Sequence, residues 1–206
     1  MKLFQRFMQV FFNLLYHPFA FTYDLVAAVV SFGQWKNWGS SIIPFIEGRR
    51  ILELGHGPGH LQRNLLNSGM VAVAIDESAS MGTLAKHRLG ASPKLARALA
   101  QKIPFASKSF DSIISTFPTN YIFDTQTLSE AHRILRSSGR LIILLGAWPR
   151  NPLLGLLFKI TGESPSESFR SIKSKITETL ARANFSSEVQ LVEVKSASLL
   201  VVVARK

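Results

Sequence analysis

Residues 51–61 read ILELGHGPGHL, in which an apolar segment runs into glycines at every second position, Gly55, Gly57 and Gly59. Glycine has no Cβ atom, so it permits sharp turns and lets a ligand approach the backbone closely. A turn alone explains one or two glycines, whereas three within five residues favour a ligand-binding loop. The surrounding pattern predicts a buried strand before this loop and a helix after it, and that arrangement restricts the fold strongly.

The rest of the sequence continues this alternation of strands and helices. Strands are predicted at 50–54, 71–76, 95–99, 110–116, 140–145, 189–195 and 199–204, and helices at 60–67, 80–89, 124–135 and 168–183. Such alternation indicates a parallel sheet with helices on both faces, in which ligands bind at the carboxyl ends of the strands. The predicted fold class is therefore α/β, a Rossmann-like three-layer sandwich.

Two acidic residues indicate what the loop binds. Asp76 closes the second strand, where a carboxylate can accept hydrogen bonds from both hydroxyls of a ribose. The glycine spacing is G-x-G-x-G rather than the G-x-G-x-x-G of dinucleotide-binding proteins, which argues against an NAD-linked oxidoreductase. Glu53 lies two residues before Gly55, a position that suits an ammonium group better than a pyrophosphate. The pattern favours a nucleoside that carries an amino-acid moiety.

Four blocks in the order ILELGHGPGHL, VAVAIDESASM, ALAQKIPFASKSFDSIISTFP and LSEAHRILRSSGRLIIL resemble the class I S-adenosylmethionine (SAM)-dependent methyltransferases. Within that class they resemble the type 11 branch, which includes quinone-biosynthesis C-methyltransferases. The resemblance covers residues 48–146. It implies a seven-stranded, mostly parallel sheet with an antiparallel last strand, SAM as cofactor, S-adenosylhomocysteine (SAH) as product, and an enzyme that transfers a methyl group to a small, hydrophobic or lipid-like acceptor.

The resemblance also implies roles for single residues. It places the methionyl part of SAM against the glycine loop, the ribose on Asp76, and the methyl group beside the end of the fourth predicted strand. The implied cofactor-binding residues are Glu53, Gly55, Gly57, Gly59, His60, Asp76, Glu77, Ser78, Met81, Ala100, Gln101, Thr116 and Pro118. Leu99 departs from the pattern, because relatives commonly have an acid there that accepts a hydrogen bond from the adenine amino group. Losing one such bond, about 0.5–1.5 kcal/mol, weakens SAM binding by roughly tenfold at most.

The first 47 residues differ from the remainder because they hold 12 of the 21 aromatic side chains. We predict a helical cap or lid at 1–47 and the methyltransferase domain at 48–206. The apolar N-terminal helix is either a lid over the cofactor or a helix on a membrane surface. Its uncharged run is interrupted by polar residues and a proline, which argues against a transmembrane span and a secretory signal.

On the acceptor side the candidate residues are Tyr23, His17, Thr116 and Tyr121. Tyr23 matches a tyrosine-containing N-terminal helix that folds over the cofactor in this branch, although a packed aromatic side chain explains it equally well. Methyl transfer from a sulfonium needs alignment more than a base, so no catalytic base is assigned. The apolar run at 152–160 is either a core helix or part of an apolar mouth for the acceptor.

The net charge of +11 favours anionic partners. The basic residues between Glu77 and Asp111 are not interleaved with aromatic ones, which argues against a nucleic-acid groove. The lack of cysteine excludes disulfides and thiolate metal sites. His56 and His60 are separated by Gly-Pro-Gly, so no helix aligns them, and no metal is predicted.

We expect a cytoplasmic protein, with the inner membrane face as a candidate docking surface. The oligomeric state stays open. The alternative to an enzyme is a SAM- or SAH-binding accessory or assembly protein without turnover. The two hypotheses differ in whether an open pocket lies beyond the methyl group, between Tyr23, Thr116 and Tyr121.

Overall fold

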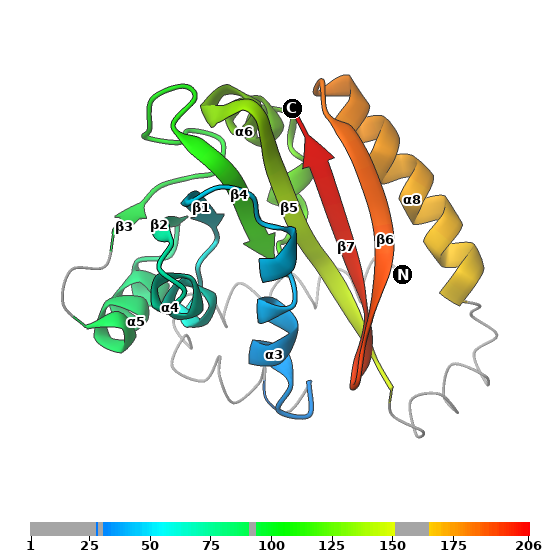
Figure 1. The fold of residues 1–206 in the computed structure, drawn as a ribbon, viewed down its shortest axis with the longest axis horizontal. Coiled ribbons are helices and arrows are strands. Elements are labelled where there is room, and N and C mark those ends of the chain that lie inside the picture. Colours follow the sequence, from blue (N-terminus) through cyan, green and yellow to red (C-terminus); the bar gives the residue numbers. More distant parts are fainter. Residues whose placement is uncertain (1–27, 29–30, 91–93, 151–164) are drawn as a thin grey trace, which may run out of the picture.

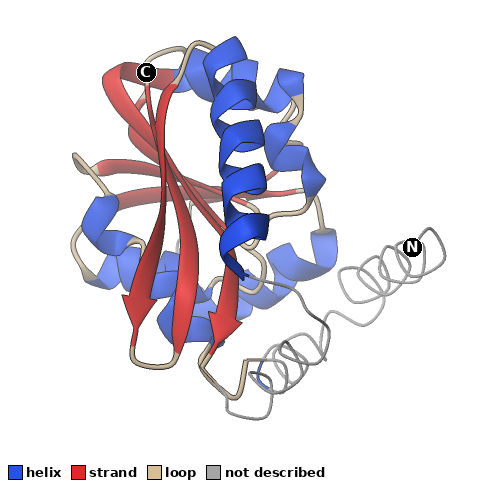
Figure 2. Ribbon diagram, turned by 90° about the vertical axis from the view of Figure 1, so that its right-hand side faces the viewer, coloured by secondary structure: helices blue, strands red, loops and turns tan. Residues whose placement is uncertain are grey.

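The computed structural model describes residue 28 and residues 31–90, 94–150 and 165–206. They form a three-layer α/β sandwich around one seven-stranded sheet with the strand order β3-β2-β1-β4-β5-β7-β6 (Figures 1 and 2). Strands β1 to β5 are parallel, and β7 is antiparallel to both of its neighbours. The predicted fold class, including the antiparallel last strand, is confirmed.

The elements have the following bounds. The strands are β1 (Arg50–Leu54), β2 (Val71–Asp76), β3 (Leu95–Arg97), β4 (Phe110–Thr116), β5 (Leu135–Pro149), β6 (Ser186–Val194) and β7 (Ala197–Arg205). The helices are α3 (Trp35–Ser40), α4 (His60–Asn67), α5 (Ala79–Leu89), α6 (Thr125–Ile134) and α8 (Pro165–Arg182), with short 3-10 turns η2 (Ile43–Phe45) and η3 (Asn120–Phe123).

Two apolar clusters cover the two faces of the sheet. One lies under α6 and α8, and the other lies under α3 and α4. Strand β7 contributes to both, with Leu200 and Val202 on the α6–α8 side and Leu199 and Val201 on the α3–α4 side. A strand covered on both faces is apolar at nearly every position, which explains the run LLVVVA in the sequence.

Several boundaries differ from the prediction, most clearly those of β5, β3 and β6. Strand β5 is much longer than 140–145 because it bulges: Leu135 pairs with Phe110, whereas Arg140 already pairs with Ser112. Ser138, with φ of 66°, lies in this bulge. Strand β3 ends at Arg97 rather than at residue 99, and among the described strands it is an edge strand that pairs with β2 alone. Strand β6 begins three residues earlier than predicted, at Ser186.

Helix α3 lies within the segment 1–47 that was predicted as a helical cap, although its bounds were not predicted, and it belongs to the layer on one face of the sheet. Trp38 and Ile42 are fully buried in the cluster under α3 and α4, and the Trp38 indole Nε1 donates to Ser196 Oγ at 2.9 Å. His17, Tyr23 and the run at 152–160 lie outside the described residues, so the lid and the boundary at residue 48 stay predictions. Among the described helices, none is long and apolar enough to cross a membrane.

Candidate functional site

The glycine loop lies at the carboxyl ends of β1 and β2. The Gly55 amide donates to Ile75 O at 2.8 Å, and the Gly57 amide donates to the Asp76 carboxylate at 2.9 Å. The three glycines have φ values of 72°, 51° and 83°, and residues that carry a Cβ atom rarely adopt such positive φ values. The predicted loop and the predicted acid are therefore in direct contact.

The three glycines differ in what surrounds them. A Cβ atom on Gly55 would lie 2.6 Å from the Tyr121 hydroxyl oxygen, and one on Gly59 would lie 3.1 Å from Cβ of Ala85 in α5. A Cβ atom on Gly57 would meet no atom of the described residues within 4 Å. Protein packing thus explains Gly55 and Gly59, whereas no side chain in the described part of the structure fills the space beside Gly57, where a ligand can approach the backbone.

Glu53 is a buried carboxylate with only 1% of its surface exposed. Its Oε2 atom has no hydrogen-bond partner within the described part of the chain. Burial, and secondarily the negative charge of Asp76, raise the pKa of Glu53 well above its ordinary value. An unpartnered buried carboxylate oxygen is unfavourable by itself and becomes favourable when a cation binds to it. The ammonium group of SAM fits this requirement.

Asp76 uses both of its carboxylate oxygens to shape the site. Oδ1 accepts from the Ser78 amide at 2.8 Å, and Oδ2 accepts from Gly57. Ser78 in turn caps α5 by accepting from the Met81 amide at 3.2 Å. A carboxylate has about four lone-pair sites, so two remain for the hydroxyls of a ribose. Asp76 can therefore also hold the ribose of a nucleoside.

His56 was not among the predicted ligand residues, although it is part of the loop. It is buried, and its Nδ1 donates to Gly57 O at 2.6 Å. Burial lowers the pKa of His56, which favours the neutral imidazole. His60, which was predicted, is the half-buried first residue of α4. Within the described residues, no group of three or more His, Asp and Glu could hold a metal ion.

The predicted adenosine residues lie around the end of β2. The Ala98 amide donates to Asp76 O at 3.2 Å, and the chain then turns through half-buried Ala100 and Gln101. Leu99, the departure from the family pattern, is 51% exposed in this turn. Glu77 is exposed, and its backbone carbonyl accepts from the Arg97 guanidinium. Met81 is fully buried on α5.

At the end of β4, Thr116 and Pro118 are half-buried on either side of a strained residue. Phe117 has φ of 49°, and its amide donates to Leu144 O at 2.7 Å. Its ring stacks on Trp35 of α3, with 3.9 Å between the ring centroids. A positive φ is a genuine outlier for a bulky residue, and such strain concentrates at functional sites. Trp35 was missed because its only sequence signal is the aromatic content of the N-terminal segment.

Tyr121 supports the glycine loop. Its hydroxyl lies 3.1 Å from Ser115 Oγ and donates to Leu54 O at 3.2 Å, and Ser115 Oγ donates to the same carbonyl at 2.8 Å. These bonds join the ends of β1 and β4 to η3. Ser115 gave no signal in the sequence, because a buried serine on a strand does not reveal its partner.

Residues 52–143 match the profile of a family described as methyltransferase domain. The ubiquinone/menaquinone biosynthesis C-methyltransferase of Geotalea uraniireducens is 34% identical over 148 residues, which are 66% of this chain and 63% of that protein. The demethylmenaquinone methyltransferase of Mycolicibacterium paratuberculosis is 33% identical over 141 residues, covering 66% of this chain and 60% of that protein. The match thus spans less than two thirds of the length of these relatives.

Solved structures share the fold at lower identity. A SAM-dependent methyltransferase from Thermotoga maritima superposes with a TM-score of 0.54 at 17% identity, over 98% of both chains. Phosphoethanolamine N-methyltransferase 2 of Haemonchus contortus, solved in complex with SAM, gives a TM-score of 0.59 at 16% identity, over 84% of this chain and 53% of that one. Together with the glycine loop, Glu53 and Asp76, these matches show that the chain belongs to the class I, type 11 family of SAM-dependent methyltransferases.

Proposed function

We propose that this chain transfers a methyl group from SAM to a small hydrophobic, lipid-like acceptor. The unpartnered, buried Glu53 side chain beside the backbone of Gly57 is the observation that carries the proposal, because a cationic ligand at the glycine loop would give its Oε2 atom a partner. The relatives named as quinone C-methyltransferases support an acceptor of this class. SAM, when bound, supplies an electrophilic methyl group on a positively charged sulfur.

The residues of the chain have separate tasks in this proposal. Glu53 binds the ammonium group, Gly57 leaves room for the methionyl chain, and Asp76 accepts from the ribose hydroxyls. The remaining predicted cofactor residues form or support the walls of this site. They are Gly55, Gly59, His60, Glu77, Ser78, Met81, Ala100, Gln101, Thr116 and Pro118. Holding cofactor and acceptor in line and excluding water accounts for much of the rate enhancement of such a transfer.

The acceptor side is formed by the aromatic pair of Trp35 and Phe117 together with Thr116. A planar, apolar acceptor gains from stacking on an aromatic wall. A carbon acceptor would form a bond to the transferred methyl group and release a proton, and SAM would leave as SAH. Closure of the N-terminal segment over the site stays a prediction, with Tyr23 and His17 as the candidate residues. The cytoplasmic location and contact with the membrane also stay predictions.

The second candidate function is binding of SAM or SAH without turnover, as an accessory or assembly protein. It is favoured by the exposed Leu99, whose side chain cannot accept a hydrogen bond from the adenine amino group. A binder without turnover would retain cofactor affinity and transfer no methyl group to any acceptor.

Calorimetric titration with SAM, SAH and NAD tests the cofactor part of the proposal. We expect binding of SAM and SAH but not of NAD. Glu53→Gln should weaken SAM binding by roughly 10- to 150-fold, the effect of one charge-assisted hydrogen bond of about 1.5–3 kcal/mol. Asp76→Ala should abolish measurable binding, since it also removes the Gly57 contact.

The matched control is Glu178→Gln, which removes an exposed carboxylate on α8 that pairs with Arg182. It should leave the affinity for SAM unchanged. Transfer of a labelled methyl group from SAM to a reduced demethylmenaquinone then separates the two candidate functions. Unaltered SAM binding in Glu53→Gln, or binding of NAD, would contradict the proposed site.

A further inference from the structure

The two edges of the sheet are protected to different degrees. Edge strands expose unpaired backbone groups, and proteins protect them with short strands, lysines, prolines or bulges. At one edge, β3 has only three residues. At the other edge, β6 has nine residues, and all nine pair with β7 without a register shift. It contains no lysine, proline or glycine. In the described part of the chain, no second strand pairs with β6.

The sequence of β6, SSEVQLVEV, is compatible with antiparallel pairing to itself. The register that pairs all nine residues is centred on Gln190, so that Glu188 lies opposite Val192, and Ser187 lies opposite Glu193. Val189 then lies opposite Leu191. Because Glu188 and Glu193 lie on opposite faces of the strand, they never face each other, and like charges opposite each other are avoided.

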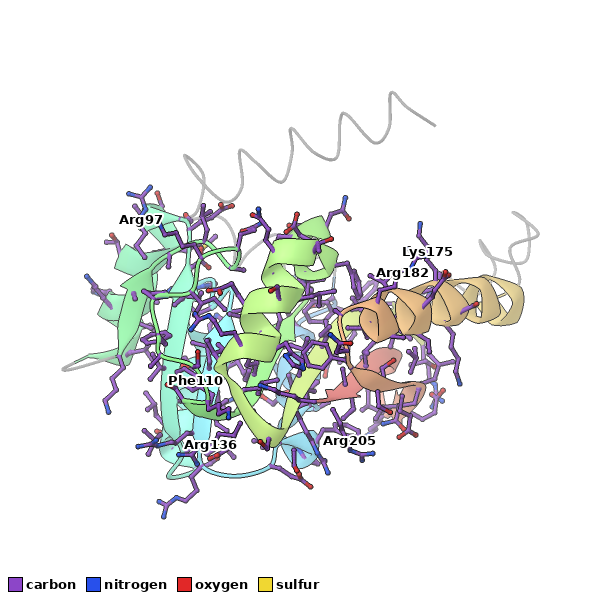
Figure 3. The ribbon with its side chains drawn as sticks, turned by 90° about the horizontal axis from the view of Figure 1, so that it is seen from above. Arg97, Phe110, Arg136, Lys175, Arg182 and Arg205 are labelled. Atoms are coloured by element: carbon purple, nitrogen blue, oxygen red, sulfur yellow. The ribbon has the colours of Figure 1, made fainter. Side chains whose placement is uncertain are left out.

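The face of the sheet that α8 covers has apolar side chains left exposed beside this edge. Leu191 is 41% exposed, although the neighbouring Val189 on the same face is buried. On α8, Ile176 and Leu180 are buried, and Ile172 continues their i, i+4 stripe but is 39% exposed. Figures 1 and 2 show α8 alongside β6, and Figure 3 shows Lys175 and Arg182, which are exposed, on the same helix.

We propose that this edge is a homodimer interface, in which β6 pairs antiparallel with β6 of a second copy about a two-fold axis at Gln190. The two sheets join into one, and the exposed Leu191 of each copy lies opposite Val189 of the other. A two-fold axis perpendicular to the sheet also places both α8 helices on the same face, where Ile172 is exposed. This inference does not depend on the proposed methyl transfer.

Single cysteines test the register, because the chain has no cysteine of its own. Opposite residues in an antiparallel pair have Cα atoms about 4.5–5.5 Å apart, a separation that a disulfide bridges. Gln190→Cys lies opposite itself in the proposed register and should form a covalent dimer under mild oxidation. Ser186→Cys is the control, because the two copies of residue 186 would lie roughly 27 Å apart, eight residues along the paired strands. Equal cross-linking of both variants would overturn the register.

Sedimentation equilibrium tests the interface itself. The wild-type chain should be a dimer at roughly 100 µM, a concentration that saturates a micromolar Kd. Leu191→Lys should raise the dimer Kd at least about tenfold, because it replaces the apolar contact with two neighbouring positive charges. Leu66→Lys is the control, since Leu66 lies on α4 and is similarly exposed, at 38%. A wild-type monomer at this concentration, or equal effects of the two variants, would overturn the proposal. Circular dichroism of each variant excludes unfolding as the cause.

Discussion

The contact between Gly55 and Tyr121 shows how one residue fixes the shape of the glycine loop. The Tyr121 hydroxyl occupies the space that a Cβ atom on Gly55 would need, and it also donates to the preceding carbonyl of Leu54. The backbone of Gly55 has φ of 72° in addition. A side chain at residue 55 is therefore excluded for two independent reasons, one steric and one conformational.

The two reasons can be separated by substitution. Gly55→Ala should lose about 1–2 kcal/mol of unfolding free energy from the positive φ and about 1–3 kcal/mol more from the clash. Tyr121→Phe removes the hydroxyl oxygen and leaves the ring carbon at 3.6 Å, an ordinary contact. The double variant should therefore lose less than the sum of the single variants, as measured by urea unfolding.

Gly69→Ala is the control for the conformational part, because Gly69 has φ of 73° and no atom of the described residues lies within 4 Å of the added Cβ. It should show the loss from positive φ alone. Strict additivity of Gly55→Ala and Tyr121→Phe would mean that the clash relaxes without energetic consequence.

At the residue scale, the sequence reveals ligand-facing groups better than supporting ones. Glu53 and Asp76 are predictable because an acid at a fixed offset from a glycine loop has a chemical meaning. Ser115 and Trp35 are not, because their contacts depend on partners far away in the chain, Leu54 for Ser115 and Phe117 for Trp35. The fold decides such contacts, and no local pattern encodes them.

Among the elements, α6 holds the segment that follows β3 in place through Arg133 and Glu130. The Arg133 guanidinium donates to Phe105 O at 2.8 Å and to Ile103 O at 3.0 Å. It also forms a bidentate salt bridge with Glu130. Glu130 accepts in turn from the Ile103 amide at 2.8 Å. This network fixes the chain just beyond Ala100 and Gln101, the predicted adenine-binding residues.

Arg133→Gln should lower the free energy of unfolding by about 1.5–3 kcal/mol, the contribution of hydrogen bonds to a charged group, and should weaken SAM binding by loosening this segment. Arg182→Gln removes a guanidinium that pairs with Glu178 on the surface of α8. Because exposed pairs contribute little, it should change stability by less than about 0.5 kcal/mol. Equal shifts of the urea midpoints of Arg133→Gln and Arg182→Gln would show that the Arg133–Glu130 network does not stabilise the fold.

The elements also differ in how far local sequence determines them. The bounds of β1, α4, β2 and β4 match the prediction because glycines, polar turns or acids mark their ends. The length of β5 depends on its bulge and on pairing with β7, which no local pattern shows. Helix α3 lies within the segment predicted as a helical cap, but its bounds were not predicted, because WKNWGS is short and its two tryptophans give only one i, i+3 repeat. Tertiary packing, through Trp38 and Ile42, decides its place in the fold.

At the scale of the whole molecule, the fold buries the carboxyl group of Glu53 at the site that we propose to be functional, and its negative charge destabilises the folded state. Glu53 is buried on β1, and the negatively charged Asp76 lies near it, so its ionised form is disfavoured in the folded state. Stability and ligand binding are therefore coupled through one proton. Folding of the free chain favours protonated Glu53, whereas an ammonium ligand favours the carboxylate.

This coupling predicts a definite pH dependence. Below the ordinary pKa of 4.5, Glu53 is protonated in both folded and unfolded chains and has no effect. As pH rises above 4.5, the unfolded chain loses this proton while the folded chain keeps it, because burial raises the folded pKa. The free energy of unfolding then decreases until the pH passes the folded pKa. Glu53→Gln should therefore be the more stable protein at neutral pH, by a margin that grows from pH 4.5 upward.

Thermal unfolding between pH 4.5 and 7, with and without SAM, measures this difference. Without ligand, the Tm of Glu53→Gln should exceed that of the wild type increasingly as pH rises. With saturating SAM the wild type should gain more than the variant, and its gain should grow with pH, since the ammonium group selects the ionised carboxylate. Parallel Tm curves for the two proteins, with equal gains from SAM, would place the ammonium group elsewhere and would remove Glu53 from the site.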